Sequence, residues 1–235
     1  HHREPFVMPG IAGVISRRPI GALASAVEHM TAIMRHDPSY SYGTYANEPL
    51  GLAIGWAVHR GAFSDCNPIW NERGDICLVF SGEEFCDDER LQRNPMPGGT
   101  SAGNDERYLL RWYEAQGPSF LAELNGSYCG AIVDLRTPQA FLFNDRFGLA
   151  RLYVHNAGHE VWFSSEAKAI LELCPSTRKM NPTALAELAT CGCALQDRSL
   201  FEGISLMPPA SVWTIGSGQV RTRAAYFSPE CLERQ

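Results

Sequence analysis

The sequence has no long hydrophobic run and no excess of positive charge. Its 235 residues contain no stretch of about 18 apolar residues, the length that marks a candidate membrane-spanning helix, so we expect no membrane partner. Lys and Arg number 20 against 26 Asp and Glu, a formal net charge of -6, and the basic residues form only short pairs such as Arg17–Arg18. Nucleic-acid binding needs a basic patch that neutralises phosphates, so no nucleic-acid partner is expected either.

A paired spacing of metal ligands is also missing. Among the eight cysteines only Cys191 and Cys193 are close in sequence, and no second pair completes a zinc pattern. The histidines considered as ligands are scattered: His29, His36, His59 and His155. We therefore expect no metal and no cofactor in this chain.

The cysteines and the first residues favour a cytoplasmic protein. Cys77 and Cys129 lie inside apolar runs, which is typical of small buried side chains. A disulfide framework is typical of much smaller secreted chains, so reduced thiols are predicted. The chain begins His1-His2-Arg3-Glu4 without the apolar core of a signal peptide, which resembles the remnant of a purification tag, with Met8 as the natural start.

What the sequence does contain is a succession of short apolar segments separated by turns. Apolar runs at 11–15, 50–58 and 76–80 predict buried strands, and Leu23, Val27 and Met30 lie at helical spacing within 20–35. Residues 36–49 are rich in Tyr, Ser, Asp, Pro and Gly and are expected to form a loop, as are residues 92–104. Further strands are expected at 128–133, 140–143, 152–155, 161–164, 211–215 and 219–225, and further helical segments at 105–124, 166–173 and 182–190. Strands mixed with helices and with a hairpin turn at 156–158 predict an α+β layered domain.

Short motifs follow one another in a particular order along most of the chain. They are Met8-Pro9-Gly10-Ile11-Ala12-Gly13, Val58-His59-Arg60, Asn67-Pro68, Ser81-Gly82-Glu83, Leu124-Asn125-Gly126, Asn144-Asp145-Arg146-Phe147-Gly148, Ser165-Glu166-Ala167-Lys168 and Leu200-Phe201-Glu202-Gly203-Ile204. In this order they resemble the N-terminal glutaminase domain of asparagine synthetase-type, class II glutamine amidotransferases. Each motif alone is weak, but their shared order over residues 8–227 is specific.

The resemblance implies an α+β Ntn-hydrolase fold, a four-layer αββα sandwich with two stacked antiparallel sheets. It divides the chain into a leader remnant at 1–7, a glutaminase-like domain at 8–227 and a tail or linker at 228–235. In the family a C-terminal synthetase domain of the same polypeptide follows, and it binds ATP and Mg through a Ser-Gly-Gly-x-Asp loop. That loop is missing from this sequence, so ATP and Mg are expected only in the synthetase domain. A homodimer is left open.

The family's catalytic machinery is incomplete in this sequence. In the family an N-terminal cysteine supplies the thiolate and its own α-amino group takes up the proton. Pro9 occupies that position and offers no nucleophilic side chain. The resemblance also implies an oxyanion hole made by an Asn side chain and the next Gly N–H. Here Gly82 remains but Ser81 replaces the Asn, and losing one such donor costs about 3–4 kcal/mol of transition-state stabilisation.

The substrate-binding charges are partly kept. The resemblance implies that Arg60 binds the α-carboxylate of glutamine in bidentate fashion and that Glu83 and Asp105 receive its α-ammonium group. The residues alone leave other interpretations open. Arg60 is also typical of a surface turn, Asp105 of a helix start, and Glu83 of a solvated loop.

We therefore expect a pseudoenzyme domain, without glutaminase activity, of an asparagine synthetase-like ligase that forms an amide with ATP, as in asparagine biosynthesis. One alternative is a sensor that binds glutamine or another amino acid without turning it over. A second is an altered amidohydrolase, in which removal of Met8 leaves the free secondary amine of Pro9 as base or nucleophile.

Overall fold

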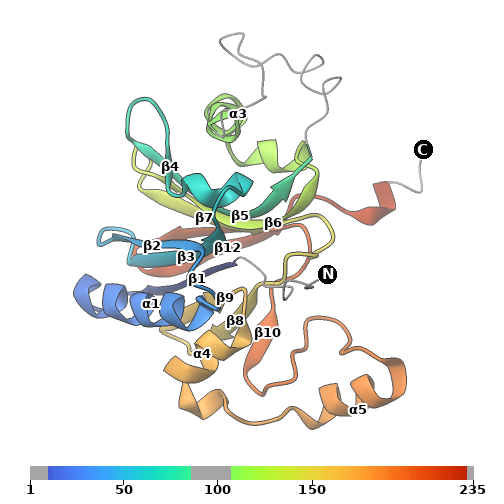
Figure 1. The fold of residues 1–235 in the computed structure, drawn as a ribbon. Coiled ribbons are helices and arrows are strands. Elements are labelled where there is room, and N and C mark those ends of the chain that lie inside the picture. The colour runs from blue at the N-terminus through green and yellow to red at the C-terminus, as the bar shows by residue number, and fades with distance from the viewer. Residues whose placement is uncertain (1–9, 86–106, 232–235) are drawn as a thin grey trace.

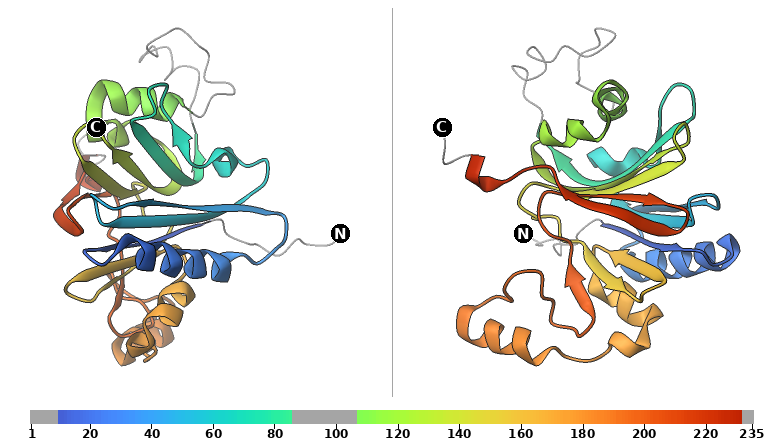
Figure 2. Two further views of the ribbon diagram at one scale, coloured as in Figure 1. Left: turned by 90° about the vertical axis from the view of Figure 1, so that its left-hand side faces the viewer. Right: turned by 180° about the vertical axis from the view of Figure 1, so that it is seen from behind.

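The computed structural model describes residues 10–85 and 107–231 and arranges them in four layers (Figure 1). Two antiparallel sheets lie face to face, and helices cover the outer face of each (Figure 2). The α+β four-layer sandwich with two stacked antiparallel sheets is thus confirmed. The expected loop at 92–104 and the segments 1–7 and 232–235 lie outside the described residues.

The first sheet has six strands with β1 near its centre. In spatial order they are β10 (Ile204–Leu206), β8 (Tyr153–Asn156), β9 (Glu160–Ser164), β1 (Gly10–Ser16), β3 (Leu52–His59) and β2 (Tyr40–Asn47). All neighbours run antiparallel, with Ala12 opposite Ser164 on one side and Gly55 on the other. Every residue of β1 is buried. A strand that is buried on both faces has a continuous apolar sequence rather than alternating apolar and polar residues, as residues 11–15 do.

The second sheet also has six strands, with β6 and β7 at its centre. In spatial order they are β12 (Gln219–Ala225), β11 (Ser211–Gly216), β7 (Gln139–Asn144), β6 (Gly126–Asp134), β5 (Ile76–Glu84) and β4 (Ile69–Trp70). Successive side chains of a strand point to opposite faces. In β5, Cys77 and Val79 therefore enter the core between the sheets, whereas Leu78 and Phe80 face the outer helix.

Amphipathic helices close the two outer faces. α1 (Ile20–Met34) and α4 (Ala167–Leu173) cover the first sheet with Leu23, Val27 and Ile170. α3 (Tyr108–Gln116) and the 3-10 helix Gly117–Ala122 cover the second sheet. The remaining helices are α5 (Pro182–Cys191) and the 3-10 helices Phe63–Cys66, Pro175–Thr177 and Pro229–Cys231. No helix among the described residues is long and apolar enough to cross a membrane.

One expected loop is in fact a strand. Residues 36–49 contain β2, at the edge of the first sheet, where Tyr40 pairs with His59 and Asn47 with Leu52. Burial falls off along this strand after Tyr40, and an edge strand tolerates polar residues and glycine because only one of its edges is paired. By contrast, the predicted hairpin over 152–164 is confirmed as β8 and β9, joined at a turn where Gly158 has φ of +83°.

Candidate functional site

The candidate site lies at the start of β1, where the end of β9 closes over the strand. The Ser165 backbone N–H donates to the Ile11 carbonyl at 2.8 Å, and the Ile11 N–H donates to Ser165 Oγ at 3.0 Å. A Cβ atom on Gly10 would lie only 2.7 Å from Ser165 Cβ, so this close approach requires glycine. The strand therefore enters the fold at a tightly fixed point.

Ser81 and Cys129 face this point from the second sheet. They are paired residues of β5 and β6, so their side chains lie on one face of that sheet. That face is the one turned toward the first sheet, because Cys129 belongs to the core between the sheets. Cys129 Sγ lies 3.6 Å from Ser165 Oγ, and Ser81 is only 2% exposed. The sequence-predicted Ser81 thus lies beside the strand that follows Pro9.

Gly82 has a conformation that its sequence neighbours do not share. Its φ is +113°, and a Cβ atom at this position would lie 2.1 Å from the Ser127 carbonyl oxygen. Only glycine adopts such a backbone without strain. The close pairing of β5 with β6 at this position depends on it.

The segment before β4 holds the middle of β5 in place. Asn67 Nδ2 donates to the Phe80 carbonyl at 2.6 Å, and the Phe80 N–H donates to Asn67 Oδ1 at 2.9 Å. This double hydrogen bond has the pattern of a strand ladder, but one side of it is a side-chain amide. Asn67 therefore positions the residue immediately before Ser81.

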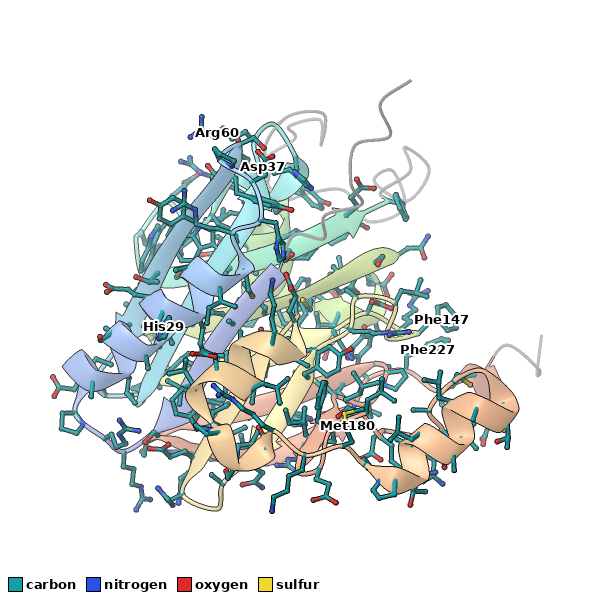
Figure 3. All side chains as sticks on the ribbon, turned by 60° about the horizontal axis from the view of Figure 1, so that its bottom comes forward. His29, Asp37, Arg60, Phe147, Met180 and Phe227 are labelled. Atoms are coloured by element: carbon teal, nitrogen blue, oxygen red, sulfur yellow. The ribbon has the colours of Figure 1, made fainter. Side chains whose placement is uncertain are left out.

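Glu83 and Arg60 are placed at the surface. Glu83 is exposed on the same face of β5 as Ser81, two residues further on. Arg60 is exposed in the turn after β3, and Figure 3 shows it at the same end of the molecule as Asp37. Its positive charge helps to hold the pKa of Asp65 below the usual value, behind the larger effects of hydrogen bonds from the Gly61 N–H and Ser41. Arg60 therefore lies near enough to Asp65 for its charge to act on that carboxylate. Pro9 and Asp105 lie outside the described residues.

A charged cluster that the sequence did not predict borders the candidate site. His36 Nε2 lies 2.7 Å from Glu166 Oε1, and Lys168 Nζ lies 3.0 Å from Glu166 Oε2. His36 follows the end of α1, whereas Glu166 immediately precedes α4 and Lys168 lies in its first turn. The only signal in the sequence was the Glu166-x-Lys168 spacing, because the contact with His36 depends on how α1 packs against α4.

Tyr40 joins this cluster to the edge of the sheet. Its side chain is 1% exposed, and its hydroxyl finds no hydrogen-bond partner among the residues that the structure describes. Its ring lies 4.7 Å from that of His59, centroid to centroid. Burial and the negative charges of Glu166 and Asp37 raise the pKa of Tyr40, so the hydroxyl stays protonated at neutral pH.

The described cysteines near the site are poor candidates for a substitute nucleophile. Burial raises the pKa of both Cys77 and Cys129 to about 12. A thiol attacks as its thiolate, and this form is scarce at neutral pH when the pKa is so high. Cys129 therefore packs the interior of the site as a neutral thiol.

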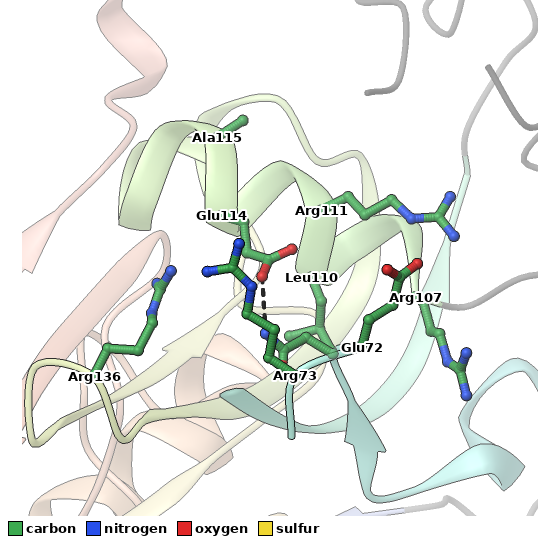
Figure 4. Close-up of a pocket in the computed structure, with 9 residues that line it drawn as sticks. Glu72, Arg73, Arg107, Leu110, Arg111, Glu114, Ala115 and Arg136 are labelled. Atoms are coloured by element: carbon green, nitrogen blue, oxygen red, sulfur yellow. Dashed lines mark hydrogen bonds between the residues drawn. The ribbon is translucent and has the colours of Figure 1, made fainter. Parts of the chain in front are cut away.

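Two histidines and one surface hollow lie apart from this chemistry. His29 is on the exposed face of α1 (Figure 3), and His155 Nδ1 contacts the Gly203 carbonyl at 2.7 Å. Within residues 10–85 and 107–231 no group of three or more His, Cys, Asp or Glu side chains is arranged to hold a metal ion. A hollow of about 590 Å³ lies between the turn before β5 and α3 (Figure 4). Four arginines and two glutamates line it, and the arginines point in different directions.

The architecture defines the class of protein. The chain superimposes on the glutamine phosphoribosylpyrophosphate amidotransferase of Bacillus subtilis with a TM-score of 0.61 and 12% identity, covering 93% of this chain and 49% of that one. A structure described as the allosteric regulatory enzyme of purine biosynthesis gives a TM-score of 0.62 at 13% identity. Identities this low establish the fold alone, which is the Ntn-type amidotransferase sandwich.

The sequence comparison identifies the family. A family model described as glutamine amidotransferase domain matches residues 8–227, and the chain belongs to that family. It is 29% identical over 134 residues to the glutamine-hydrolyzing asparagine synthetase 2 of Bacillus subtilis, covering 54% of this chain and 18% of that protein. It is 24% identical over 152 residues to asparagine synthetase B of Escherichia coli, covering 64% of this chain and 27% of that protein. The chain thus matches only a minor part of these relatives' length.

Proposed function

We propose that this chain is a glutaminase-inactive amidotransferase domain of an asparagine synthetase-like enzyme that forms an amide with ATP. Its role there is to support the synthetase domain rather than to supply ammonia from glutamine. The observation that carries the proposal is Pro9, which immediately precedes the fixed strand start at Gly10.

The nucleophile is the first requirement for amide hydrolysis. Proline has no side-chain group that can attack a carbonyl, and its ring nitrogen is an amide nitrogen whenever a residue precedes it. Cys129, the described cysteine in contact with Ser165, has its pKa raised to about 12 and is fully enclosed. Neither residue supports a covalent thioester intermediate.

The oxyanion site is the second requirement. Gly82 is present with a positive φ, but the Ser81 side chain is shorter than the amide that the resemblance implies. A buried hydroxyl that falls short of the developing negative charge stabilises it little, because such a donor acts at about 2.7–3.1 Å. Both defects reduce the same reaction, which is why we infer a loss of activity rather than a change of substrate.

The test combines an ammonia-release assay with calorimetric titration of L-glutamine, on protein that begins at Met8. The wild type should release no ammonia above the background of its Ser81→Ala variant. Replacing Pro9→Cys together with Ser81→Asn should create measurable release, because it restores both missing groups on an intact fold. Ammonia release by the wild type above the Ser81→Ala background would overturn the proposal.

The titration separates the remaining alternatives. Saturable glutamine binding without ammonia, abolished by Arg60→Ala but kept by Arg73→Ala, would establish the amino-acid sensor. Arg73 is the matched control because it is also exposed in a turn, beside α3. If the protein neither binds glutamine nor releases ammonia, that result supports the purely structural role. Release that disappears when the amine of Pro9 is blocked would establish the altered amidohydrolase.

A further inference from the structure

The loop after β7 exposes large apolar side chains. In residues 146–151, which we name the apolar loop, Phe147 is 54% exposed and Leu149 is 63% exposed. Single exposed apolar residues are ordinary, but two on one short loop beside an apolar hollow form a patch. The hollow measures about 650 Å³, and its walls include Phe147, Leu206, Met207, Pro208 and Pro209.

The apolar loop is held in one shape from below. The carboxylate of Asp145, which is fully buried, accepts hydrogen bonds from three backbone N–H groups: Phe147 at 3.0 Å, Leu149 at 3.0 Å and Ala150 at 2.8 Å. Gly148 makes the turn with φ of +65° and packs against Pro209. A loop that is already ordered loses little conformational entropy when a partner covers it. The apolar side chains are therefore presented as a preorganised surface.

The last described segment of the chain runs onto this surface. The Tyr226 hydroxyl donates to the Asn144 carbonyl at 2.7 Å, and the Tyr226 N–H donates to the Ala210 carbonyl at 2.9 Å. The next ring, Phe227, meets Phe147 edge to face at a centroid distance of 6.0 Å, and the two rings project side by side in Figure 3. The guanidinium carbon of Arg146 lies 5.2 Å from the Phe227 ring centroid. The chain thus leaves β12 at a fixed position on the apolar loop.

We propose that the apolar loop and its hollow are the docking surface for a C-terminal synthetase domain of the same polypeptide, such as the relatives carry. The aligned relatives are longer proteins. The match covers 18% of the asparagine synthetase of Bacillus subtilis and 32% of that of rice. Phe227 contacts Phe147 of the apolar loop, so a domain that follows this segment is tethered close to this surface. The inference rests on the proposed function, because it takes its partner from that enzyme.

The test is hydroxyl-radical footprinting of the full-length polypeptide and of the 235-residue chain. Phe147 and Leu149 should be oxidised at least tenfold more slowly in the full-length protein. Tyr42 is the internal control, because it is 56% exposed on the edge strand β2 of the first sheet and should be oxidised equally in both. In the full-length protein, Phe147→Ser with Leu149→Ser should expose residues 228–235 to limited proteolysis, and Tyr42→Ser should not.

The outcomes separate this inference from the proposed function. Equal oxidation of Phe147 in both proteins, while the full-length enzyme forms its amide from ammonia and ATP, would overturn the docking surface and leave the function standing. Protection of Phe147 in a full-length enzyme that hydrolyses glutamine would overturn the proposed function and leave the docking surface standing. A dimer of the 235-residue chain that Phe147→Ser dissociates would assign the surface to a second copy and overturn the inference.

Discussion

Ser165 Oγ lies 3.6 Å from Cys129 Sγ, so one contact joins the end of β9 in the first sheet to the middle of β6 in the second. The same hydroxyl accepts the Ile11 N–H at 3.0 Å. The start of β1 is therefore held from both sheets at once.

The thiols should differ sharply in reactivity. Cys66, Cys191 and Cys193 are exposed, whereas Cys77 and Cys129 are buried with pKa values of about 12. At pH 8 only about one in ten thousand of the buried thiols is ionised, and the reagent has no access to them. Alkylation followed by peptide mass spectrometry should label the exposed three within minutes and the buried two only in denaturant. Native labelling of Cys129 at the rate of Cys66 would mean that the site is open.

Gly82→Ala should destabilise the domain strongly. The new Cβ would lie 2.1 Å from the Ser127 carbonyl at a φ of +113°, so β5 and β6 must separate. We expect a loss of about 3 kcal/mol in the free energy of unfolding, measured by urea titration. Gly61→Ala is the matched control, because Gly61 has φ of +78° with open space around it and should lose only about 1 kcal/mol. Equal losses would show that backbone strain alone matters at Gly82.

Asp145→Asn should loosen the apolar loop. The buried carboxylate accepts three N–H groups, and an amide in its place turns a donor toward them. We expect a loss of about 2–3 kcal/mol in the free energy of unfolding and faster hydrogen exchange at Phe147, Leu149 and Ala150. The control is Asp37→Asn, which removes an exposed carboxylate that accepts one N–H, from Ser39 at 2.7 Å, and should leave the urea midpoint unchanged. Unchanged exchange at Leu149 would mean that the loop's shape does not depend on Asp145.

The fold was predictable from the sequence wherever a segment carried its own pattern. Residues 11–15 and 76–80 are apolar on both faces because both faces of their strands are buried, and Asn156-Ala157-Gly158 supplies its own turn. Residues 40–47 carry no such pattern. Their strand is specified by pairing with β3, which is a property of the partner and not of the segment.

The candidate site was predictable only in part, for the same reason. Ser81 and Gly82 were found through their motif, and the structure turns Ser81 toward the interior between the sheets. The contact between Cys129 and Ser165 depends on the stacking of two sheets, and that between His36 and Glu166 on helix packing. The roles of Arg60, Glu83 and Asp105 in binding stay predictions.

Asp134 should make the domain's stability depend on acid pH. Burial alone would raise the pKa of this carboxyl, but hydrogen bonds from Arg136 at 2.7 and 2.9 Å and from Tyr113 at 3.0 Å outweigh burial and lower the pKa. A lowered pKa means that the ionised form stabilises the fold above the unfolded-state value of about 3.9. This stabilisation is lost as the pH falls through the folded-state pKa.

The Asp134→Asn variant tests this dependence. At pH 7 we expect its free energy of unfolding to be about 2 kcal/mol lower than that of the wild type, because Arg136 and Tyr113 lose their charged acceptor. The difference should shrink as the pH is lowered below about 4, since the wild-type carboxyl then becomes protonated as well. Glu172→Gln serves as control, because Glu172 pairs with Arg178 at the surface and both side chains are about half exposed, so its effect should be small at every pH. A difference between wild type and Asp134→Asn that stays constant from pH 7 to pH 3 would show that the stabilisation comes from packing and not from the ionised carboxylate.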